Sequence, residues 1–190
     1  MEPVPYKEAL VRIAEEERRG GWLAYCESRG VYQWPTTEWV DALAGILLPL
    51  GARRPLEVGA GGGTLGRALR DRGLPFILTD PEGREDVDRL SVAEALEAHR
   101  PDLVLSCWLP FDLGAEKIIF ARPGVRWYLA VVQTGPGFAG SEALWRDHGW
   151  ASRRIEEADR WSVSRTDYLT DIGKGEHIRH GAAFLFTRQP

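Results

Sequence analysis

The stretch LEVGAGGG, residues 56–63, decides the fold because it reads as a buried strand that runs into a glycine-rich turn. Glycines are needed where the backbone adopts a positive φ or where a ligand approaches without a Cβ in its way. A turn between a strand and a helix also directs the free N–H groups of the helix N-terminus at a bound group. The following helix is expected over GGTLGRALRDRG, residues 62–73. The stretch therefore predicts a ligand site at the carboxyl end of a strand.

From Arg54 onward the chain alternates between strand-like and helix-like segments. Strand patterns cover residues 54–59, 74–80, 101–109 and 125–135. Helix patterns follow them at residues 62–73, 91–100, 112–122 and 141–149. This alternation predicts an α/β fold, a Rossmann-like three-layer sandwich with a mainly parallel sheet. Two strand-like runs, 159–169 and 181–189, close the chain with no helix between them, so we expect a C-terminal antiparallel hairpin strand.

An N-terminal helical extension precedes this core. Apolar residues recur at helical spacing over residues 7–19, and a second helix is expected over residues 36–48, with Thr36 or Thr37 as its N-cap. We therefore expect one domain of residues 1–190, in which residues 1–50 form the extension or a lid and residues 54–190 form the core.

The segment between the two N-terminal helices is rich in rings, namely those of Tyr25, Tyr32, Trp34 and Pro35. Two interpretations remain open. The segment could fold over the ligand site as a lid and offer aromatic faces to a cation or a ring. It could equally be a hydrophobic plug that holds the N-terminal helices to the sheet.

Composition and charge narrow the class of protein. A hydrophobic content of 44% and a charged content of 27% are typical of a globular chain. The formal net charge of -4 argues against a nucleic-acid partner. Cys26 and Cys107 have no metal-ligand spacing and are expected as reduced thiols. The N-terminus does not resemble a signal peptide, and no apolar run approaches the roughly 20 residues of a membrane span, so we expect a cytoplasmic protein with no membrane partner.

Two acidic residues flank the glycine-rich turn and indicate what it binds. Glu57 stands just before the glycines, where its carboxylate would repel a pyrophosphate and would suit a ligand with a positive amino group or sulfonium. Asp80 ends the next strand, where a carboxylate can accept the protons of both hydroxyls of a ribose. The pair predicts a ligand with a cationic part and a sugar diol.

This pattern resembles the E/D-x-G-x-G-x-G signature of class I S-adenosylmethionine-dependent methyltransferases, with Asp80 at the ribose-binding acidic position of that family. The resemblance covers residues 54–190 and implies S-adenosylmethionine as the cofactor. It implies that Glu57 helps to position the amino group of the cofactor, often through water. The glycines that it places against the methionine part are Gly59, Gly61 and Gly63. It places Ser91 and Val92 near the adenine ring.

The run SCWLPF, residues 106–111, is similar to a relaxed S-W-P-P-aromatic motif of the same family, which lines the passage between methyl donor and acceptor. The resemblance implies that Cys107 contacts the cofactor and that Cys107 and Trp108 belong to the catalytic site. Cys107 replaces the polar residue that would bind a target amine, and Leu109 replaces the first proline, so methylation of adenine N6 is disfavoured. The alternative is that Cys107 and Trp108 simply finish a buried strand.

Methyl transfer depends mainly on the alignment of donor and acceptor with water excluded. A general base is needed only when the acceptor must lose a proton. Asp112 is the nearest candidate base and is included among the catalytic residues, although it also fits as the N-cap of the helix at 112–122. His148 is a more remote candidate.

Two further segments are of interest. The loop QTGPGFAGSE, residues 133–142, follows the fourth strand and is expected to form a wall on the ligand side. His177 and His180 have a spacing that two metal ligands on a helix could use, but no Cys or carboxylate cluster accompanies them. We interpret them as a polar loop and expect no metal site.

Three functions remain open. The favoured hypothesis is a methyltransferase that acts on a small molecule or a peptide. A nicotinamide-dependent oxidoreductase is the second, because Gly61-x-Gly63-x-x-Gly66 also satisfies the dinucleotide pattern. In that case, however, the first glycine of the pattern would lie two residues beyond the end of the strand. The acidic residue that follows the pattern would also come too early in the sequence for a dinucleotide site. The third is a non-catalytic binding protein that retains the fold.

Overall fold

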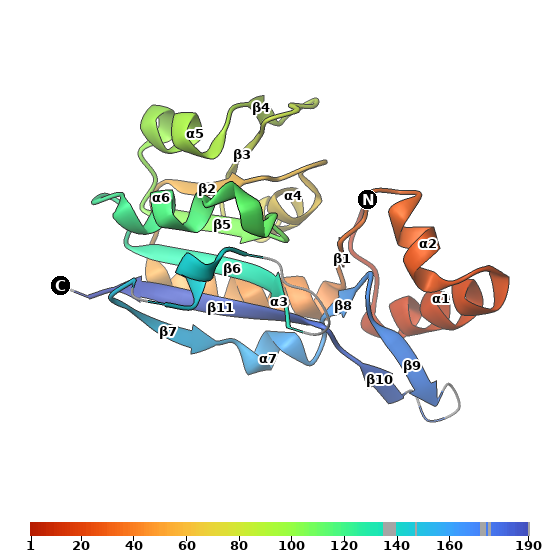
Figure 1. Cartoon of the computed structure of the whole chain (residues 1–190). Helices are drawn as coiled ribbons and strands as arrows, with labels where there is room; N and C mark the ends of the chain where they lie inside the picture. Colours follow the sequence, from red (N-terminus) through yellow and green to blue (C-terminus); the bar gives the residue numbers. More distant parts are fainter. Residues whose placement is uncertain (135–139, 147, 172–173, 175, 190) are drawn as a thin grey trace.

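The computed structural model describes residues 1–134, 140–146, 148–171, 174 and 176–189. A seven-stranded sheet forms its centre, with the strand order β4-β3-β2-β5-β6-β11-β7 (Figure 1). These strands are β2 (Pro55–Val58), β3 (Ile77–Asp80), β4 (Asp88–Arg89), β5 (Leu103–Cys107), β6 (Trp127–Gln133), β7 (Trp150–Arg154) and β11 (Gly181–Arg188). The first five strands in the order pair in parallel, and β11 is antiparallel to both of its neighbours. The predicted fold class is confirmed.

Helices cover both faces of this sheet and make three layers (Figure 1). On one face α3 (Thr37–Leu47) packs against α4 (Thr64–Arg70) and α7 (Glu156–Asp159). On the other face α5 (Val92–His99) packs against α6 (Ala115–Ala121). The predicted N-cap of the second helix is confirmed, because the Thr36 side chain accepts a hydrogen bond from the Trp39 N–H at 3.2 Å.

The strand order places a crevice beside the glycine-rich turn. From β2 the chain adds β3 and β4 on one side, and it then crosses to add β5 and β6 on the other. The carboxyl ends of β2 and β5 therefore lie at the point where the order reverses, which is where open α/β sheets bind their ligands.

The last strand, β11, is antiparallel as predicted, but the strand before it in the hairpin is not the predicted one. The run 159–169 is not a strand of the main sheet, because it begins at the last residue of α7 and contains β8 (Val163–Ser164) and the start of β9 (Tyr168–Asp171). The strand beside β11 is instead β7, which the sequence does not reveal. Residues 151–154 of this edge strand are exposed, so it lacks the alternation of apolar residues that marks a half-buried strand. The predicted helix at 141–149 is reduced to a 3-10 turn, Glu142–Leu144.

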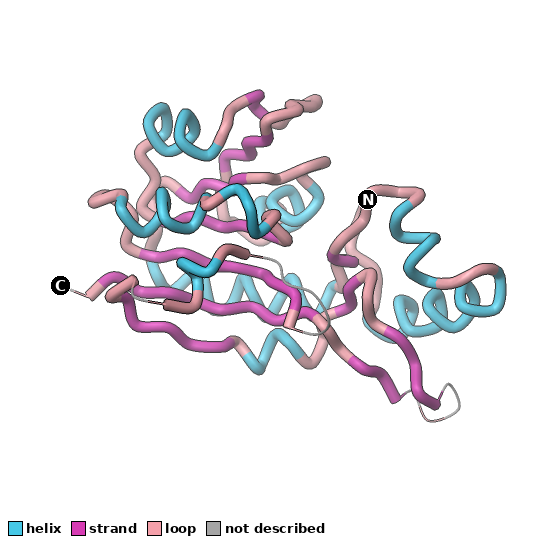
Figure 2. Tube along the Cα trace, in the orientation of Figure 1, coloured by secondary structure: helices cyan, strands magenta, loops and turns pink. Residues whose placement is uncertain are grey.

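A smaller lobe, here called the N-terminal lobe, consists of residues 1–36 and the described residues of 160–180. It contains α1 (Tyr6–Arg19), α2 (Trp22–Glu27), a β1 (Gln33–Trp34) to β8 pair, and a hairpin of β9 and β10 (Glu176–Ile178). It lies beyond the carboxyl ends of β5 and β6 (Figure 2). Its own hydrophobic core comprises Tyr6, Ala9, Ile13, Trp22, Cys26, Trp34 and Val163.

This second core contains part of the aromatic segment. Trp34 is buried and its ring lies 5.3 Å from that of Trp22, which stacks on Tyr25 at 5.6 Å. Pro35 accepts a backbone hydrogen bond from Val4. Trp34 therefore packs in the way that the plug interpretation expects, whereas Tyr32 is exposed. Within the described part of the chain, no helix is both long and apolar enough to cross a membrane.

Candidate active site

The glycine-rich turn connects β2 to α4 and has the backbone conformation that its glycines predict. Gly59, Gly61 and Gly63 have φ values of 63°, 53° and 70°. These values lie in the left-handed region, which strongly favours glycine. The Ala60 N–H donates to the carbonyl of Thr79 at 3.0 Å and ties the turn to β3.

One side of the turn is open and the other is packed. A Cβ added at Gly61 or Gly62 would have no neighbour within 4 Å. A Cβ at Gly59 would lie 2.4 Å from the Leu109 side chain, and one at Gly63 would lie 2.9 Å from Leu78. The space into which a ligand could approach therefore lies over Gly61 and Gly62, whereas Leu109 covers Gly59.

Asp80 lies directly against this turn. One of its carboxylate oxygens, Oδ2, accepts a hydrogen bond from the Gly61 N–H at 2.8 Å, and Oδ1 accepts one from the Glu82 N–H at 2.9 Å. Asp80 is only partly buried. A carboxylate oxygen can accept about two hydrogen bonds, so each oxygen retains capacity for another donor.

Glu57 is buried under the first turn of α4. The residue is 2% exposed, and its Oε2 has no hydrogen-bond partner among the described residues. A Cβ added at Gly66 would lie 2.3 Å from that oxygen, so Gly66 is the residue that leaves room for the carboxyl group. Burial raises the pKa of Glu57 to about 8, although the Gly66 N–H and the charge of Arg67 oppose the rise. Near neutral pH the free protein therefore holds a largely uncharged Glu57.

The end of β5 brings Cys107 and Trp108 to the same edge of the sheet. Burial and the neighbouring Glu57 raise the pKa of the Cys107 thiol well above its usual value, so the thiol stays neutral. Trp108 has a φ of 60°, which is rare for a residue with a side chain, and its Nε1–H donates to Gln33 Oε1 at 3.2 Å. Trp108 thus turns the chain sharply after the strand and contacts the N-terminal lobe.

Ser91 and Val92 lie at the start of α5, a short distance along the chain from the strand that pairs with Asp80. The register pairs Asp80 with Arg89, two residues before Ser91. The Ser91 side chain forms a capping box with Glu94, so this hydroxyl already has a structural role as the N-cap of α5.

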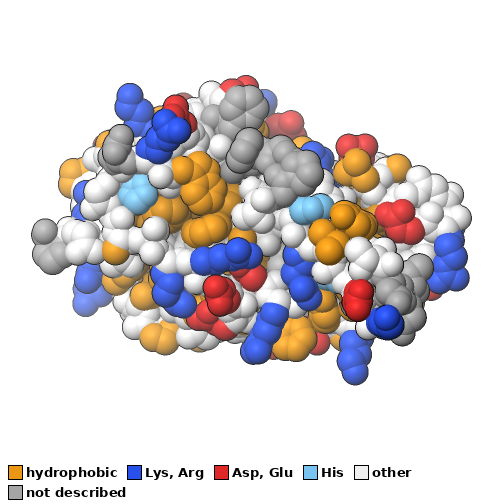
Figure 3. Space-filling model, turned by 60° about the horizontal axis from the view of Figure 1, so that its bottom comes forward, with side chains coloured by type: hydrophobic (Ala, Val, Ile, Leu, Met, Phe, Trp, Pro, Cys, Tyr) orange, Lys and Arg blue, Asp and Glu red, His pale blue; other side chains and the backbone are white. Residues whose placement is uncertain are grey.

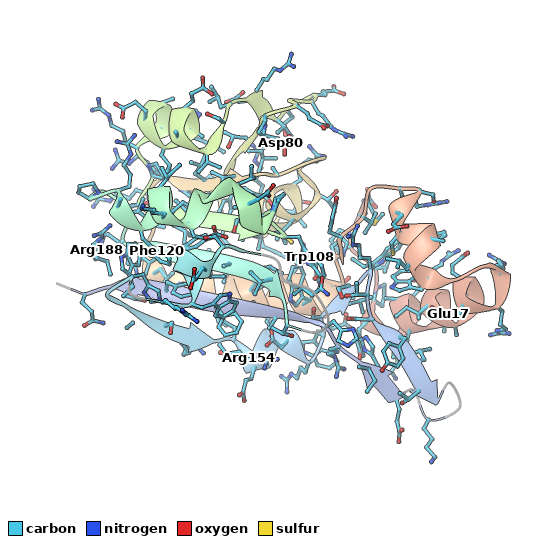
Figure 4. All side chains as sticks on the ribbon, in the orientation of Figure 1. Glu17, Asp80, Trp108, Phe120, Arg154 and Arg188 are labelled. Carbon is cyan, nitrogen blue, oxygen red and sulfur yellow. The ribbon has the colours of Figure 1, made fainter. Side chains whose placement is uncertain are left out.

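The two candidate bases differ in position: Asp112 follows the end of β5 on the exposed surface, and His148 lies away from the turn. Asp112 is exposed in a 3-10 turn, Phe111–Leu113, and the alternative prediction that it caps the next helix is wrong because α6 begins after Gly114. His148 stacks on Phe120 at 4.7 Å, and its Nδ1 accepts a hydrogen bond from the Trp150 N–H. Phe120 is at the far end of the sheet from Trp108 and Asp80 (Figure 4), which separates His148 from the turn.

The interpretation of residues 177–180 as a polar loop is wrong for His177. This residue lies on β10, its side chain is 1% exposed, and its Nε2 lies 2.9 Å from Asp167 Oδ2. His180 Nδ1 lies 2.7 Å from the Thr166 carbonyl oxygen. Of the loop predicted as a wall on the ligand side, residues 135–139 lie outside the described residues.

Sequence reasoning missed Gln33 and Arg165, which come from the N-terminal lobe. Tyr32, at 47% exposure, lies beside Trp108 with 6.2 Å between ring centroids. The Arg165 guanidinium carbon lies 4.2 Å from the Tyr32 centroid. No motif signals these residues, because they reach the end of β5 only through pairing of β1 with β8.

Two cavities lie elsewhere. One of about 260 Å³ is lined by Phe120 and His148, and one of about 330 Å³ is lined by Arg54, Arg100 and Arg122 near the amino ends of the strands. Neither includes a residue of the glycine-rich turn. We place the candidate site at the turn for three reasons. Glu57 Oε2 has no hydrogen-bond partner among the described residues, and the Asp80 oxygens can each accept a further hydrogen bond. The turn also lies where the strand order of the sheet reverses.

The sequence matches no protein-family model and no curated protein. Solved structures with a similar fold include 1,6-didemethyltoxoflavin-N1-methyltransferase from Burkholderia thailandensis with bound 1,6-didemethyltoxoflavin and S-adenosylhomocysteine, at 15% identity and a TM-score of 0.48 over 81% of this chain and 80% of that one. The methyltransferase domain of bacterial CtHen1 has 13% identity and a TM-score of 0.49 over 79% of this chain and 97% of that one. PigF with S-adenosylhomocysteine has 13% identity and a TM-score of 0.48 over 81% and 62%. At these values the likeness carries no functional argument, and any assignment depends on the site itself.

Proposed function

We propose that this protein is an S-adenosylmethionine-dependent methyltransferase that acts on a small molecule or a peptide. The observation that carries the proposal is the position of Asp80. Its carboxylate holds the Gly61 N–H and retains acceptor capacity next to the open face of Gly61 and Gly62. A carboxylate in this position fits the two hydroxyls of a ribose.

The buried carboxyl group of Glu57 fits the cationic part of the same ligand. Its Oε2 lacks a partner, and a buried acceptor without a donor is costly. An ammonium group near the turn would supply charge that favours the ionised form of Glu57. In this proposal Gly59, Gly61 and Gly63 shape the turn against the methionine part, and Ser91 and Val92 border the adenine ring.

When bound, S-adenosylmethionine supplies an electrophilic methyl carbon, whose bond to sulfur breaks as its bond to the acceptor atom forms, so that sulfur departs as a neutral thioether. Trp108 and Cys107 would line the passage to the acceptor. The neutral Cys107 thiol is suited to packing and not to proton abstraction. Asp112 is the proposed base for an acceptor that must lose a proton. The buried ring of Trp108 would help to exclude water.

The sheet itself argues against the oxidoreductase. The usual dinucleotide-binding sheet has the strand order 3-2-1-4-5-6. Here an antiparallel strand, β11, is inserted between β6 and β7. On the face in Figure 3, basic side chains are interspersed with acidic and apolar ones. Together with the net charge of -4, this pattern favours a small-molecule or peptide acceptor over nucleic acid.

Calorimetric titration with S-adenosylhomocysteine and, separately, with NADH tests the proposal. The wild type should bind S-adenosylhomocysteine, and Asp80→Asn should weaken binding by roughly 10- to 100-fold, because hydrogen bonds to a charged group are lost. Glu82→Gln is the matched control, since it removes an exposed carboxylate two residues away and should bind as the wild type does.

Two outcomes would overturn the proposal. Binding of NADH that is weakened by Asp80→Asn would support an oxidoreductase. Binding of neither compound by the wild type would support a non-catalytic protein of the same fold.

A further inference from the structure

Arg165 occupies the junction between the N-terminal lobe and the carboxyl edge of the sheet. It lies between β8 and β9, and its N–H donates to the carbonyl of Tyr32 at 3.0 Å. Its guanidinium carbon lies 4.2 Å from the ring centroid of Tyr32 and 6.0 Å from that of Trp108. The cation therefore stacks on aromatic rings contributed by both parts of the molecule.

The charge of Arg165 has no acidic partner within ion-pair distance among the described residues. Its Nε is buried and has no hydrogen-bond partner in that part of the chain. Asp167, two residues on, is already engaged with Ser164, His177 and His180. A buried N–H without an acceptor costs about 1–3 kcal/mol, so the guanidinium is not satisfied by the described residues.

The position of this cation relates it to the acceptor and not to the cofactor. Trp108 directly follows Cys107, at the end of the strand next to β2, and its indole is held by Gln33. Arg165 approaches Trp108 from the N-terminal lobe. Asp80 belongs to β3, which lies on the opposite side of β2 from β5 and Trp108.

We propose that Arg165, stacked on Tyr32 and Trp108, binds an anionic group of the methyl acceptor, either a carboxylate or a phosphate. The link to an acceptor rests on the proposed function. Stacking fixes the plane of the guanidinium, and its Nη groups can donate charge-assisted hydrogen bonds to an oxyanion. The neighbouring aromatic faces suit an apolar or planar body attached to that anion.

The test follows the Arg165 Nε–H signal by ¹H–¹⁵N NMR, assigned with Arg165→Gln, in the presence of saturating S-adenosylhomocysteine. Benzoate and phenyl phosphate are the anionic probes, and benzamide is the neutral control. At least one anion should shift this signal saturably, and benzamide should not. The anion that binds more tightly identifies the group as a carboxylate or a phosphate.

Variants separate this site from general attraction to a basic surface. Arg165→Gln should weaken binding of the effective anion by roughly 10-fold or more. Arg165→Lys, which keeps the charge without the planar fork, should weaken it less and covers the case in which the Gln variant does not fold. Arg160→Gln is the matched control, because Arg160 also stacks on a tryptophan, Trp161, at 5.1 Å.

The proposal is overturned if neither anion shifts the Nε–H signal, or if Arg160→Gln weakens binding as much as Arg165→Gln does. Failure of the proposed function is separable, because S-adenosylhomocysteine binding is measured independently on the same proteins. Arg165→Gln should leave that binding unchanged. If the wild type does not bind S-adenosylhomocysteine, the probes are titrated without it, and a saturable shift would establish an anion site in a protein of another function.

Discussion

Two buried carboxyl groups, Asp167 in the N-terminal lobe and Glu57 in the central sheet, differ in how many hydrogen bonds they receive. In the N-terminal lobe, Asp167 receives four hydrogen bonds. Ser164 Oγ and the His180 N–H donate to Oδ1, and the Ser164 N–H and His177 Nε2 lie against Oδ2. In the sheet, the Glu57 carboxyl group faces the Gly66 N–H, but its Oε2 has no hydrogen-bond partner among the described residues. A saturated carboxylate fixes a structure, whereas an unsaturated one retains capacity for a ligand.

The hydrogen bonds around Asp167 extend to the N-terminal helix. His177 Nδ1 lies 3.0 Å from the Tyr6 hydroxyl, to which Arg179 Nη2 donates at 2.5 Å. Arginine has no acceptor, so the hydroxyl accepts from Arg179 and can donate its own proton to His177 Nδ1. His177 Nε2 then carries the proton that faces Asp167. This chain ties α1 to the β9–β10 hairpin and gives the two histidines a structural role.

Replacement of Asp167 by Asn should have the largest effect. All the partners of Asp167 donate hydrogen bonds to its carboxylate. The NH₂ group of an asparagine would therefore face at least one of these donors, and neither group could accept. Loss of a buried, charged hydrogen-bonding partner costs about 3–5 kcal/mol. The free energy of unfolding, measured in urea, should fall by that amount in Asp167→Asn.

Glu176→Gln is the control for this change, because it removes an exposed carboxylate from the same hairpin and should alter stability by less than about 0.5 kcal/mol. A loss below about 1 kcal/mol in Asp167→Asn would show that the network is not what holds the lobe together.

Glu57→Gln should raise the free energy of unfolding, whereas Asp167→Asn should lower it. Burial raises the pKa of Glu57 from 4.5 to about 8, so its neutral form is favoured in the folded protein. The stability that this group contributes is complete below pH 4.5 and is lost as the pH rises through about 8. Glutamine is neutral throughout, so the variant should be more stable than the wild type by about 2–4 kcal/mol at pH 8 and equal to it at pH 4.

Urea unfolding of wild type and variant across this pH range measures the difference, with Glu82→Gln as the exposed control. A difference that does not change with pH would mean that Glu57 is already charged and satisfied. The contrast with Asp167 would then disappear.

The sequence predicts the sheet side of this contrast well and the lobe poorly, for a physical reason. Glu57, the glycines and Asp80 are positioned by two adjacent strands and one turn, and local patterns specify such elements. The network of the lobe joins Tyr6 to His177 across 171 residues, and no periodicity records that pairing. The Trp108–Gln33 hydrogen bond, across 75 residues, is likewise not predicted by any sequence pattern. The polar edge strand β7 was missed because it buries so little.

The smallest effects come from two glycines that are only four residues apart. A Cβ at Gly66 would lie 2.2 Å from Leu78 and 2.3 Å from Glu57 Oε2, whereas one at Gly62 would meet nothing within 4 Å. Alanine favours a helix by about 1 kcal/mol over glycine, but overpacking against buried neighbours costs about 1–3 kcal/mol or more. Gly66→Ala should therefore lose about 1–2 kcal/mol in urea unfolding.

Gly62→Ala should show the reverse pattern, because its new methyl group occupies the open face of the turn. Stability should stay within about 0.5 kcal/mol of the wild type. Affinity for S-adenosylhomocysteine should fall by roughly tenfold, since the methyl group would occupy space that the proposal assigns to the cofactor. Unchanged affinity in Gly62→Ala would place the ligand elsewhere on the turn. A stable Gly66→Ala would mean that Glu57 moves freely, and that its unsaturated oxygen is not confined by the helix above it.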